Sequence, residues 1–295
     1  MASEELEVIR ELLRGADLDG MSIDERRKMG AAVTPTAPPG TTVSVVDAGG
    51  VPAEWVVPAD AGDGRVLLYF HGGGYQMGSP ATLRHLVALL AAAASARCFS
   101  VDYRLAPEHP FPAAVDDAVA AYRWLLSIGT DPARMVVCGD SAGGGLALGS
   151  LVALRDAGEP MPAAVVLLSP WTDLALTGES LRTRADVEVM VTPGGMPETA
   201  GLYLAGADPR HPYASPLYAD LTGLPPLLIH VGDAEVIRDD STRLAVRARA
   251  AGVPVTIEVW DEMPHVFPAF AGLLPEADQA IEHIGGWLAD KLPTR

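Results

Sequence analysis

Short, continuously apolar segments alternate with longer helix-like segments over most of this chain, and this alternation limits the folds that the chain can adopt. Buried strands are expected at residues 65–70, 98–101, 135–138, 164–168, 227–231 and 255–260. Helices are expected at residues 80–95, 112–127, 142–157, 239–251 and 276–290. Apolar strands that alternate with helices are typical of a mostly parallel sheet covered by helices on both faces. The pattern therefore predicts the α/β class.

The first residues have the periodicity of an amphipathic helix over residues 3–14, with Ser3 as the N-cap and Gly15 at its end. One face of this helix is expected to be apolar, made of Leu6, Ile9, Leu12 and Leu13.

Two further regions do not follow the alternation. Residues 15–40 are polar and then rich in Pro and Gly, which indicates a connector, and the runs 41–46 and 55–57 suggest an antiparallel start to the sheet. Residues 172–222 are long for a connection in a parallel sheet and contain short helical pieces. Long insertions of this kind tend to be lids or binding elements.

Composition excludes several classes of protein. The 295 residues carry a formal net charge of −17 and no cluster of Lys and Arg, which argues against nucleic acids and against anionic membrane surfaces as partners. The longest apolar run, residues 86–96, is too short to span a bilayer, and the acidic first residues do not resemble a signal peptide. Cys98 and Cys138 lie in apolar contexts and are expected to be buried thiols. We therefore expect a cytoplasmic protein without membrane insertion.

The strongest chemical signal is the pentapeptide Gly139-Asp140-Ser141-Ala142-Gly143, which follows an expected strand and opens an expected helix. Gly-x-Ser-x-Gly in this context is a nucleophile elbow, a tight turn that needs small residues on both sides of the serine. The N-terminus of the following helix adds positive potential where an oxyanion develops. This pattern predicts Ser141 as a nucleophile.

A second glycine-rich segment, His71-Gly72-Gly73-Gly74, directly follows the strand expected at 65–70. Backbone N–H groups of Gly73 and Gly74, together with that of Ala142, are expected to form an oxyanion hole. His71 is expected to support this loop through hydrogen bonds. A phosphate-binding loop is disfavoured because no Gly-Lys-Ser/Thr follows the glycines.

A serine nucleophile needs a histidine base and a carboxylate that orients it. His265 suits the base because it lies just past the expected strand 255–260. The acid is expected after strand 227–231, where sequence physics alone does not choose among four carboxylates: Asp233, Glu235, Asp239 and Asp240.

Several ordered motifs together resemble the bacterial hormone-sensitive-lipase-like esterases (family IV carboxylesterases) of the α/β-hydrolase superfamily. The motifs are His71-Gly72-Gly73-Gly74-Tyr75, Asp102-Tyr103-Arg104-Leu105-Ala106-Pro107-Glu108, Pro110-Phe111-Pro112-Ala113-Ala114, Gly139-Asp140-Ser141-Ala142-Gly143-Gly144 and Leu224-Pro225-Pro226. The resemblance covers roughly residues 45–290. It implies an α/β-hydrolase fold, a mostly parallel central sheet flanked by helices, with a helical cap.

The resemblance also implies a Ser-His-Glu triad of Ser141, His265 and Glu235. Glu235 falls on the family's acid position, where many members have Asp followed by Pro and this chain has Glu followed by Val236. Asp233 is the alternative acid, and Asp239 matches a supporting residue.

The family's cap is built from two separated segments, which correspond here to residues 1–40 and to an insertion at about 175–215 in the catalytic domain 41–295. Candidate wall residues of the substrate pocket are Tyr75, Trp171, Met190, Met196 and Tyr203. Apolar side chains of this kind line pockets and ordinary cores alike.

The function expected from the resemblance is a serine carboxylesterase that hydrolyses short-chain acyl esters of small molecules, without a cofactor or metal. The sequence contains neither a His-Glu-x-x-His nor a Cys-x-x-Cys spacing, so a metal hydrolase is poorly supported. Two alternatives use the same fold: an amidase or deacetylase acting on small acetylated molecules, and a non-catalytic ligand receptor. Family members often dimerise through a sheet edge or late helices, so a homodimer is a further expectation.

Overall fold

The computed structural model describes residues 3–15, 20–32, 36–62 and 64–292. Its strands form one eight-stranded sheet in the order β1-β2-β4-β3-β5-β6-β7-β8. The strands are β1 (Thr42–Asp47), β2 (Pro52–Val57), β3 (Val66–Phe70), β4 (Arg97–Val101), β5 (Met135–Asp140), β6 (Ala164–Leu168), β7 (Leu227–Gly232) and β8 (Val255–Trp260). The predicted strands are therefore all present.

The sheet begins antiparallel and continues parallel. Strand β2 pairs antiparallel with both β1 and β4, and every later pair, from β4–β3 to β7–β8, is parallel. Every residue of β3, β5, β6 and β7 is buried, as expected for strands covered on both faces. The predicted α/β-hydrolase fold is confirmed.

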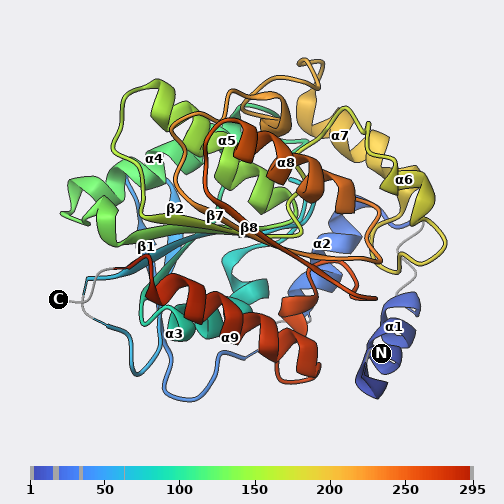
Figure 1. The fold of residues 1–295 in the computed structure, drawn as a ribbon, viewed down its shortest axis with the longest axis horizontal. Helices are drawn as coiled ribbons and strands as arrows, with labels where there is room; N and C mark the ends of the chain where they lie inside the picture. The colour runs from blue at the N-terminus through green and yellow to red at the C-terminus, as the bar shows by residue number, and fades with distance from the viewer. Residues whose placement is uncertain (1–2, 16–19, 33–35, 63, 293–295) are drawn as a thin grey trace.

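Helices cover both faces of the sheet, with α4, α5 and α8 on one face and α3 and α9 on the other (Figure 1). The α-helices are α1 (Glu4–Arg14), α2 (Ile23–Ala32), α3 (Arg84–Ala93), α4 (Ala113–Ser127), α5 (Ala142–Asp156), α6 (Ser180–Thr183), α7 (Met196–Leu204), α8 (Arg238–Ala250) and α9 (Pro275–Ala289). Each face has its own apolar core, one containing Leu146 and Leu244 and the other Leu86 and Ile284. Both cysteines are buried free thiols, as predicted.

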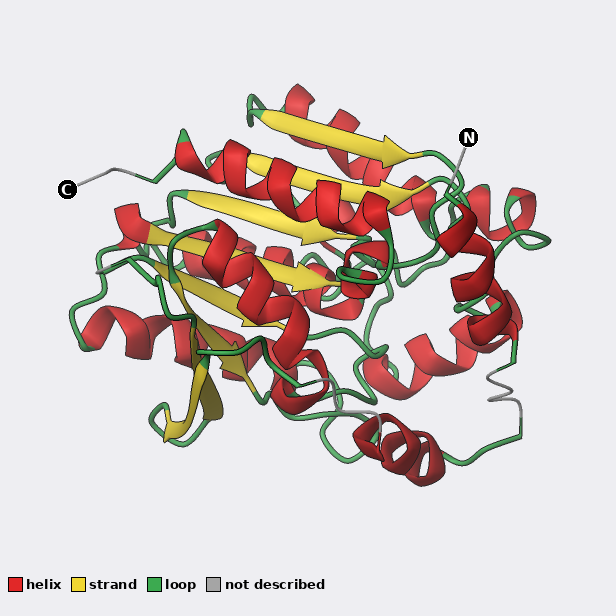
Figure 2. Cartoon of the chain, turned by 90° about the horizontal axis from the view of Figure 1, so that it is seen from below, coloured by secondary structure: helices red, strands yellow, loops and turns green. Residues whose placement is uncertain are grey.

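The parallel strands point toward the side of the molecule where the shorter helices lie (Figure 2). Helices α1, α2, α6 and α7 gather beyond this end of the sheet (Figure 1). The long stretch 172–222 contains short helical pieces, as expected, including α6 and α7. The division of the cap into residues 1–40 and about 175–215 stays a prediction. No helix among the residues described here is long and apolar enough to cross a bilayer.

The N-terminal region differs from the sequence-based prediction in three ways. Leu6 and Ile9 are buried, but Leu12 is 66% exposed, so the predicted apolar face is wrong at that position. Ser3 is the N-cap residue of α1, as predicted, but its side chain makes no capping hydrogen bond and donates instead to Glu276 Oε2 (2.8 Å). The expected connector contains helix α2, which the pattern did not reveal because α2 buries none of its residues.

Candidate active site

Ser141 occupies a strained turn between β5 and α5. Its φ of +52° and ψ of −122° are unusual for a residue with a side chain, and such backbone strain is concentrated at functional sites. A Cβ atom on Gly139 would overlap the carbonyl of Gly143, and a Cβ on Gly143 would overlap the carbonyl of Phe70. The turn therefore forms only with glycine at both positions, which is the physical content of the elbow pattern.

The predicted nucleophile, base and acid lie in one hydrogen-bonded row. Ser141 Oγ is 2.9 Å from His265 Nε2, and His265 Nδ1 is 2.7 Å from Glu235 Oε2. With the ring proton on Nδ1, that nitrogen donates to Glu235 and Nε2 accepts from the serine hydroxyl. The three side chains come from the loops that follow β5, β7 and β8, because the carboxyl ends of these parallel strands meet at one edge of the sheet.

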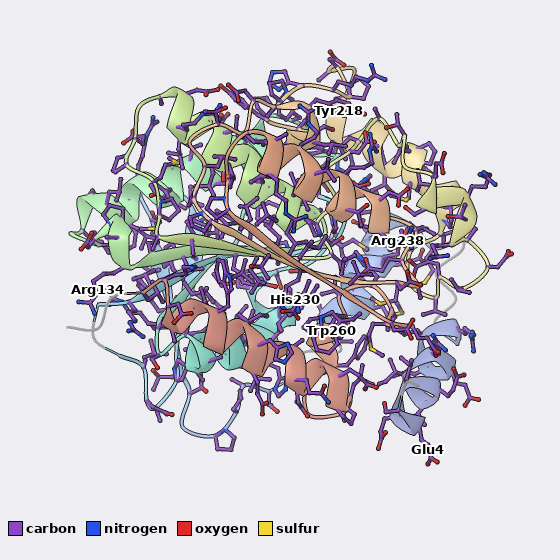
Figure 3. The ribbon with its side chains drawn as sticks, viewed as in Figure 1. Glu4, Arg134, Tyr218, His230, Arg238 and Trp260 are labelled. Atoms are coloured by element: carbon purple, nitrogen blue, oxygen red, sulfur yellow. The ribbon has the colours of Figure 1, made fainter. Side chains whose placement is uncertain are left out.

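The alternative acid, Asp233, binds two arginines and has no hydrogen bond to the imidazole in the described structure. Its carboxylate accepts from Arg184 (3.0 Å) and Arg238 (2.8 Å), and Figure 3 shows Arg238 on the α6 side of the molecule. Partial burial raises the pKa of Asp233, but the hydrogen bonds and charges of the two arginines outweigh this and hold it below its usual range. Among the four carboxylates left open by the sequence, only Glu235 contacts His265.

Ser169, at the end of β6, is a site residue that the sequence reasoning missed. Its hydroxyl donates to Glu235 Oε1 (2.6 Å) and accepts from the backbone N–H of Val266 (3.0 Å). Ser169 thus connects Glu235 to the residue that follows His265. A polar residue directly after a fully apolar strand, at the edge where the other strands place their site residues, is the signal that could have revealed it.

Burial and charge act in opposite directions on the imidazole. Desolvation alone lowers the pKa of His265, but the charge and hydrogen bond of Glu235, with smaller contributions from Glu188 and Asp140, raise it above its ordinary value. Burial also raises the pKa of Glu235, against the opposing effects of His265, Ser169 and the N–H of Gly232. The fully buried carboxylate is therefore stabilised by its hydrogen-bond donors, which are His265, the Ser169 hydroxyl and the N–H of Gly232.

The three backbone N–H groups predicted for the oxyanion hole, those of Gly73, Gly74 and Ala142, have no hydrogen-bond partner among the described residues. The loop that carries the two glycines is attached to the elbow through Asp140. Asp140 Oδ1 accepts from the N–H of Gly72 (2.9 Å) and from the hydroxyl of Tyr69 (2.7 Å). Burial raises the pKa of Asp140 to about 6, although these hydrogen bonds oppose the rise.

His71 supports the glycine loop through hydrogen bonds and ring stacking. Its Nδ1 lies 2.7 Å from the carbonyl oxygen of Gly72, its ring stacks on Tyr103, and the Tyr103 hydroxyl donates to the His71 carbonyl (2.6 Å). Burial lowers the pKa of His71 to about 4, so the ring is neutral near pH 7. A neutral ring with its proton on Nδ1 can donate to the carbonyl of Gly72, which is the supporting role predicted for His71.

The aromatic candidates for the pocket wall lie against the first turn of α5. Tyr75 stacks on Tyr203 with ring centroids 3.7 Å apart, and the Trp171 ring is 6.3 Å from that of Tyr75. The backbone N–H of Trp171 donates to the carbonyl of Ser141 (2.8 Å), and the Tyr75 hydroxyl lies 2.8 Å from where a Cβ on Gly145 would be.

The two methionine candidates differ from each other. Met196 is buried and Met190 is 40% exposed. Pocket contact stays a prediction for these methionines as it does for the three aromatic residues. In the described part of the chain, no group of three His, Cys, Asp or Glu side chains is arranged to hold a metal ion.

Comparison with known proteins places this fold and site in a family. A family model for the alpha/beta hydrolase fold matches residues 67–269. An acetyl-hydrolase of Streptomyces hygroscopicus is 50% identical over 98% of this chain and 97% of its own length. An esterase of Acinetobacter venetianus is 37% identical over 77% of this chain and 76% of its own. The crystal structure of an esterase from the bacterial hormone-sensitive lipase family has a TM-score of 0.96 and 47% identity, covering 99% of this chain and 100% of that one.

The chain therefore belongs to the alpha/beta-hydrolase family. The predicted resemblance to the bacterial hormone-sensitive-lipase-like esterases is confirmed, as is the prediction of an enzyme of the carboxylic ester hydrolase class.

Proposed function

We propose that the protein is a serine carboxylesterase in which Ser141 is the nucleophile, His265 the general base and Glu235 the acid that orients the base. The observation that carries this proposal is the unbroken hydrogen-bonded row from Ser141 Oγ through His265 to Glu235. A nucleophile in reach of a base that is itself oriented by a third group defines this type of catalysis.

The reaction proceeds in two halves. His265 Nε2 takes the proton of Ser141 as Oγ attacks the ester carbonyl, and the same proton then passes to the leaving alkoxide, which departs as the alcohol. Water attacks the acyl-serine with His265 as the base, and the carboxylic acid leaves as Ser141 regains its proton. Glu235 keeps the imidazole in the tautomer that can accept at Nε2 and stabilises the imidazolium that forms.

The oxyanion of each tetrahedral intermediate is proposed to bind the N–H groups of Gly73, Gly74 and Ala142. Since no residue that the structure describes accepts from them, all three are available to donate to substrate. Losing one donor of an oxyanion hole typically costs about 3 kcal/mol of transition-state stabilisation. Asp140 would support this arrangement by holding Gly72 against the elbow.

We propose short-chain acyl esters as the substrates. The stacked pair Tyr75–Tyr203 and Trp171 are fully or almost fully buried beside the first turn of the nucleophile's helix, where bulky aromatic groups restrict the room for an acyl chain. Rates with nitrophenyl esters from acetyl to dodecanoyl test this proposal. We expect the highest kcat/KM at four carbons or fewer, and a maximum at the longest chain would contradict it.

The mechanism is tested by Ser141→Ala, with Ser150→Ala as the matched control. Ser150 lies in the same helix, is buried, and its hydroxyl donates only to the carbonyl of Ala147 (2.9 Å). Loss of the nucleophile is expected to lower kcat by about 10⁴-fold or more, while the control retains most of the activity. A fluorophosphonate should label wild type and the control but not Ser141→Ala. Labelling of the Ser141→Ala variant would contradict the assignment, and absence of labelling in wild type would favour the non-catalytic receptor.

A second candidate function is deacetylation of a small acetylated molecule, including an acetyl amide. It is favoured by the printed name of the Streptomyces hygroscopicus relative, an acetyl-hydrolase. Matched acetyl ester and acetyl anilide substrates separate the two functions, because an amide requires protonation of a poorer leaving group. A higher kcat/KM for the anilide would favour the second function.

Three further proposals concern the whole protein. Residues 1–40 and about 175–215 are proposed to form the cap over the substrate pocket, supported by the position of α1, α2, α6 and α7 at the catalytic end of the sheet (Figure 1).

A homodimer is proposed because β8 is an edge strand of the sheet, and sedimentation tests it. Cytoplasmic location is proposed from the sequence and is tested by cell fractionation.

A further inference from the structure

Part of the proposed cap is attached directly to the loop that carries the catalytic acid. The segment 180–191 contacts the backbone of that loop on both sides of Glu235. Arg184 Nε donates to the carbonyl of Asp233 (2.8 Å), and Ser180 Oγ donates to the carbonyl of Val236 (2.6 Å). The position of the acid thus depends on contacts that are neither part of the sheet nor part of the triad.

Glu188 binds the backbone of the residue that directly follows Glu235 in the chain. Its Oε2 accepts from the backbone N–H of Val236 (3.1 Å), a buried residue that directly follows Glu235. Its Oε1 accepts from three successive N–H groups of residues 189–191, at 2.8, 2.8 and 3.2 Å. The ionised form of the Glu188 carboxylate can accept from all four of these N–H groups. In the protonated form one oxygen carries a proton and accepts less well.

The same carboxylate acts on the catalytic imidazole through its charge. Three carboxylates raise the pKa of His265: first Glu235, which is hydrogen bonded to it, then Glu188, then Asp140 at the end of β5. Asp140 is already hydrogen bonded to the glycine loop, so its position is set by the oxyanion side of the site. Glu188 is the one of the three that comes from the proposed cap.

The other charged groups near this loop are paired with one another. Arg184 of the 180–191 segment and Arg238 of α8 both bind Asp233. On the side of α1, Arg10 donates to the carbonyl of Glu262 (2.7 Å) and pairs with Glu7 (2.6 Å). The charges of these arginines are thus offset by their own partners, and Glu188 adds a negative charge.

We propose that Glu188 is a positioning residue of the triad, which joins the cap to the backbone of the acid loop and places a further negative charge near His265. This inference rests on the proposed function. Glu188 touches no reacting atom. It holds Val236 so that Glu235 faces the imidazole, and its charge favours the imidazolium that forms as Ser141 loses its proton.

The test compares Glu188→Gln, which keeps the shape and removes the charge, with Glu188→Asp and Ser180→Ala. Ser180→Ala removes a contact between the same segment and the same loop without a change in charge. Two readouts are needed: the titration of the His265 ring, followed by NMR and assigned with His265→Ala, and the pH profile of kcat/KM. The NMR titration does not require that the protein hydrolyse any ester.

Without the charge of Glu188 the imidazolium is less favoured, so the pKa of His265 should fall. For a partly solvated charge we expect a fall of about half a pH unit in Glu188→Gln, in the titration and in the acid limb of the profile. The plateau of kcat should drop several-fold. Glu188→Asp should keep the titration midpoint near that of wild type with a lower kcat, and Ser180→Ala should keep the midpoint too.

Two outcomes would overturn the inference. One is a Glu188→Gln protein that titrates at the wild-type midpoint, and the other is a Ser180→Ala protein that shifts as much as Glu188→Gln, because a loosened segment would then explain the shift. If Glu188→Gln does not fold, a Glu188→Asp midpoint displaced by half a unit overturns it equally. A wild type without esterase activity or fluorophosphonate labelling would contradict the proposed function alone, since the NMR midpoints would still decide the role of Glu188.

Discussion

The two regions that meet around Ser141, the carboxyl edge of the sheet and the helices beyond it, are stabilised by different kinds of contact. At the edge, Ser169, Glu235 and His265 are buried and joined by hydrogen bonds of 2.6–2.7 Å. In the outer region, Arg27 of α2 pairs with Glu108 (2.7 Å), and the two side chains are 24% and 52% exposed.

This difference predicts where substitutions should have large effects. A buried polar group that loses its partner keeps the full cost of desolvation, whereas an exposed ion pair contributes about 0–1 kcal/mol. Changes at the sheet edge should therefore act strongly on kcat. Changes in the outer helices should act weakly, and mainly on KM. Glu188 lies between the two regions, since it belongs to the outer one and contacts the acid loop.

The largest effect is expected for Glu235→Ala compared with Asp233→Ala. The first variant leaves His265 without its partner and should lower kcat by about 10³- to 10⁴-fold. The second breaks only a partly exposed pair with Arg184 and Arg238 and should lower kcat less than about tenfold. Steady-state kinetics on a short nitrophenyl ester measure both. A greater loss in Asp233→Ala would mean that the acid is misassigned.

An intermediate effect is expected for Ser169→Ala, which removes the hydrogen bond to Glu235 and leaves the N–H of Val266 unpaired. We expect a loss of about tenfold in kcat and a loss of about 1–3 kcal/mol in the free energy of unfolding. The matched control is Ser100→Ala, since Ser100 is a buried strand residue whose hydroxyl has no partner in the described structure. Equal losses in the two variants would show that Ser169 does not support the acid.

The smallest effect is expected for Arg27→Ala. Arg27 also donates to the carbonyls of Gln76 (2.7 Å) and Ala106 (2.9 Å), so it attaches α2 to the loop that follows the oxyanion glycines. We expect KM to rise a few-fold with kcat nearly unchanged. The control is Arg123→Ala, which breaks a comparable exposed pair with Glu159 in another part of the molecule. A large loss of kcat in Arg27→Ala would remove the distinction between the two regions.

The same pair has a defined pH dependence. The hydrogen bond from Arg27 lowers the pKa of Glu108 to about 2. Because this folded-state pKa lies below the ordinary value of 4.5, the stabilisation is present above that value and is lost as the pH falls toward 2. Wild type and Arg27→Ala should therefore differ in thermal stability at pH 6, and the difference should shrink near pH 2.

The positions of Ser141 and His265 at the carboxyl edge of the sheet were largely predictable from the sequence, because short local patterns mark them. The strand–turn–helix context and the small residues around Ser141 define the elbow, and His265 follows the last strand. Helix α2 was not predictable, because its sequence has no apolar stripe and it is attached through the side chain of Arg27 instead. Leu12 shows the opposite error, an apolar residue in helical register that is 66% exposed.

The sequence by itself determined the α/β class, the alternation of strands and helices, the elbow at Ser141 and the position of His265 after the last strand. These depend on periodicity and on backbone conformations that only certain residues adopt. The residue pattern alone left four carboxylates open and the family resemblance pointed to Glu235. The tertiary structure shows that Glu235 contacts His265, and it alone revealed Ser169 and Glu188. Asp233 and Glu235 are chemically alike and two residues apart. What separates them is their surroundings, two arginines for one and a buried imidazole for the other, and these come from distant parts of the chain.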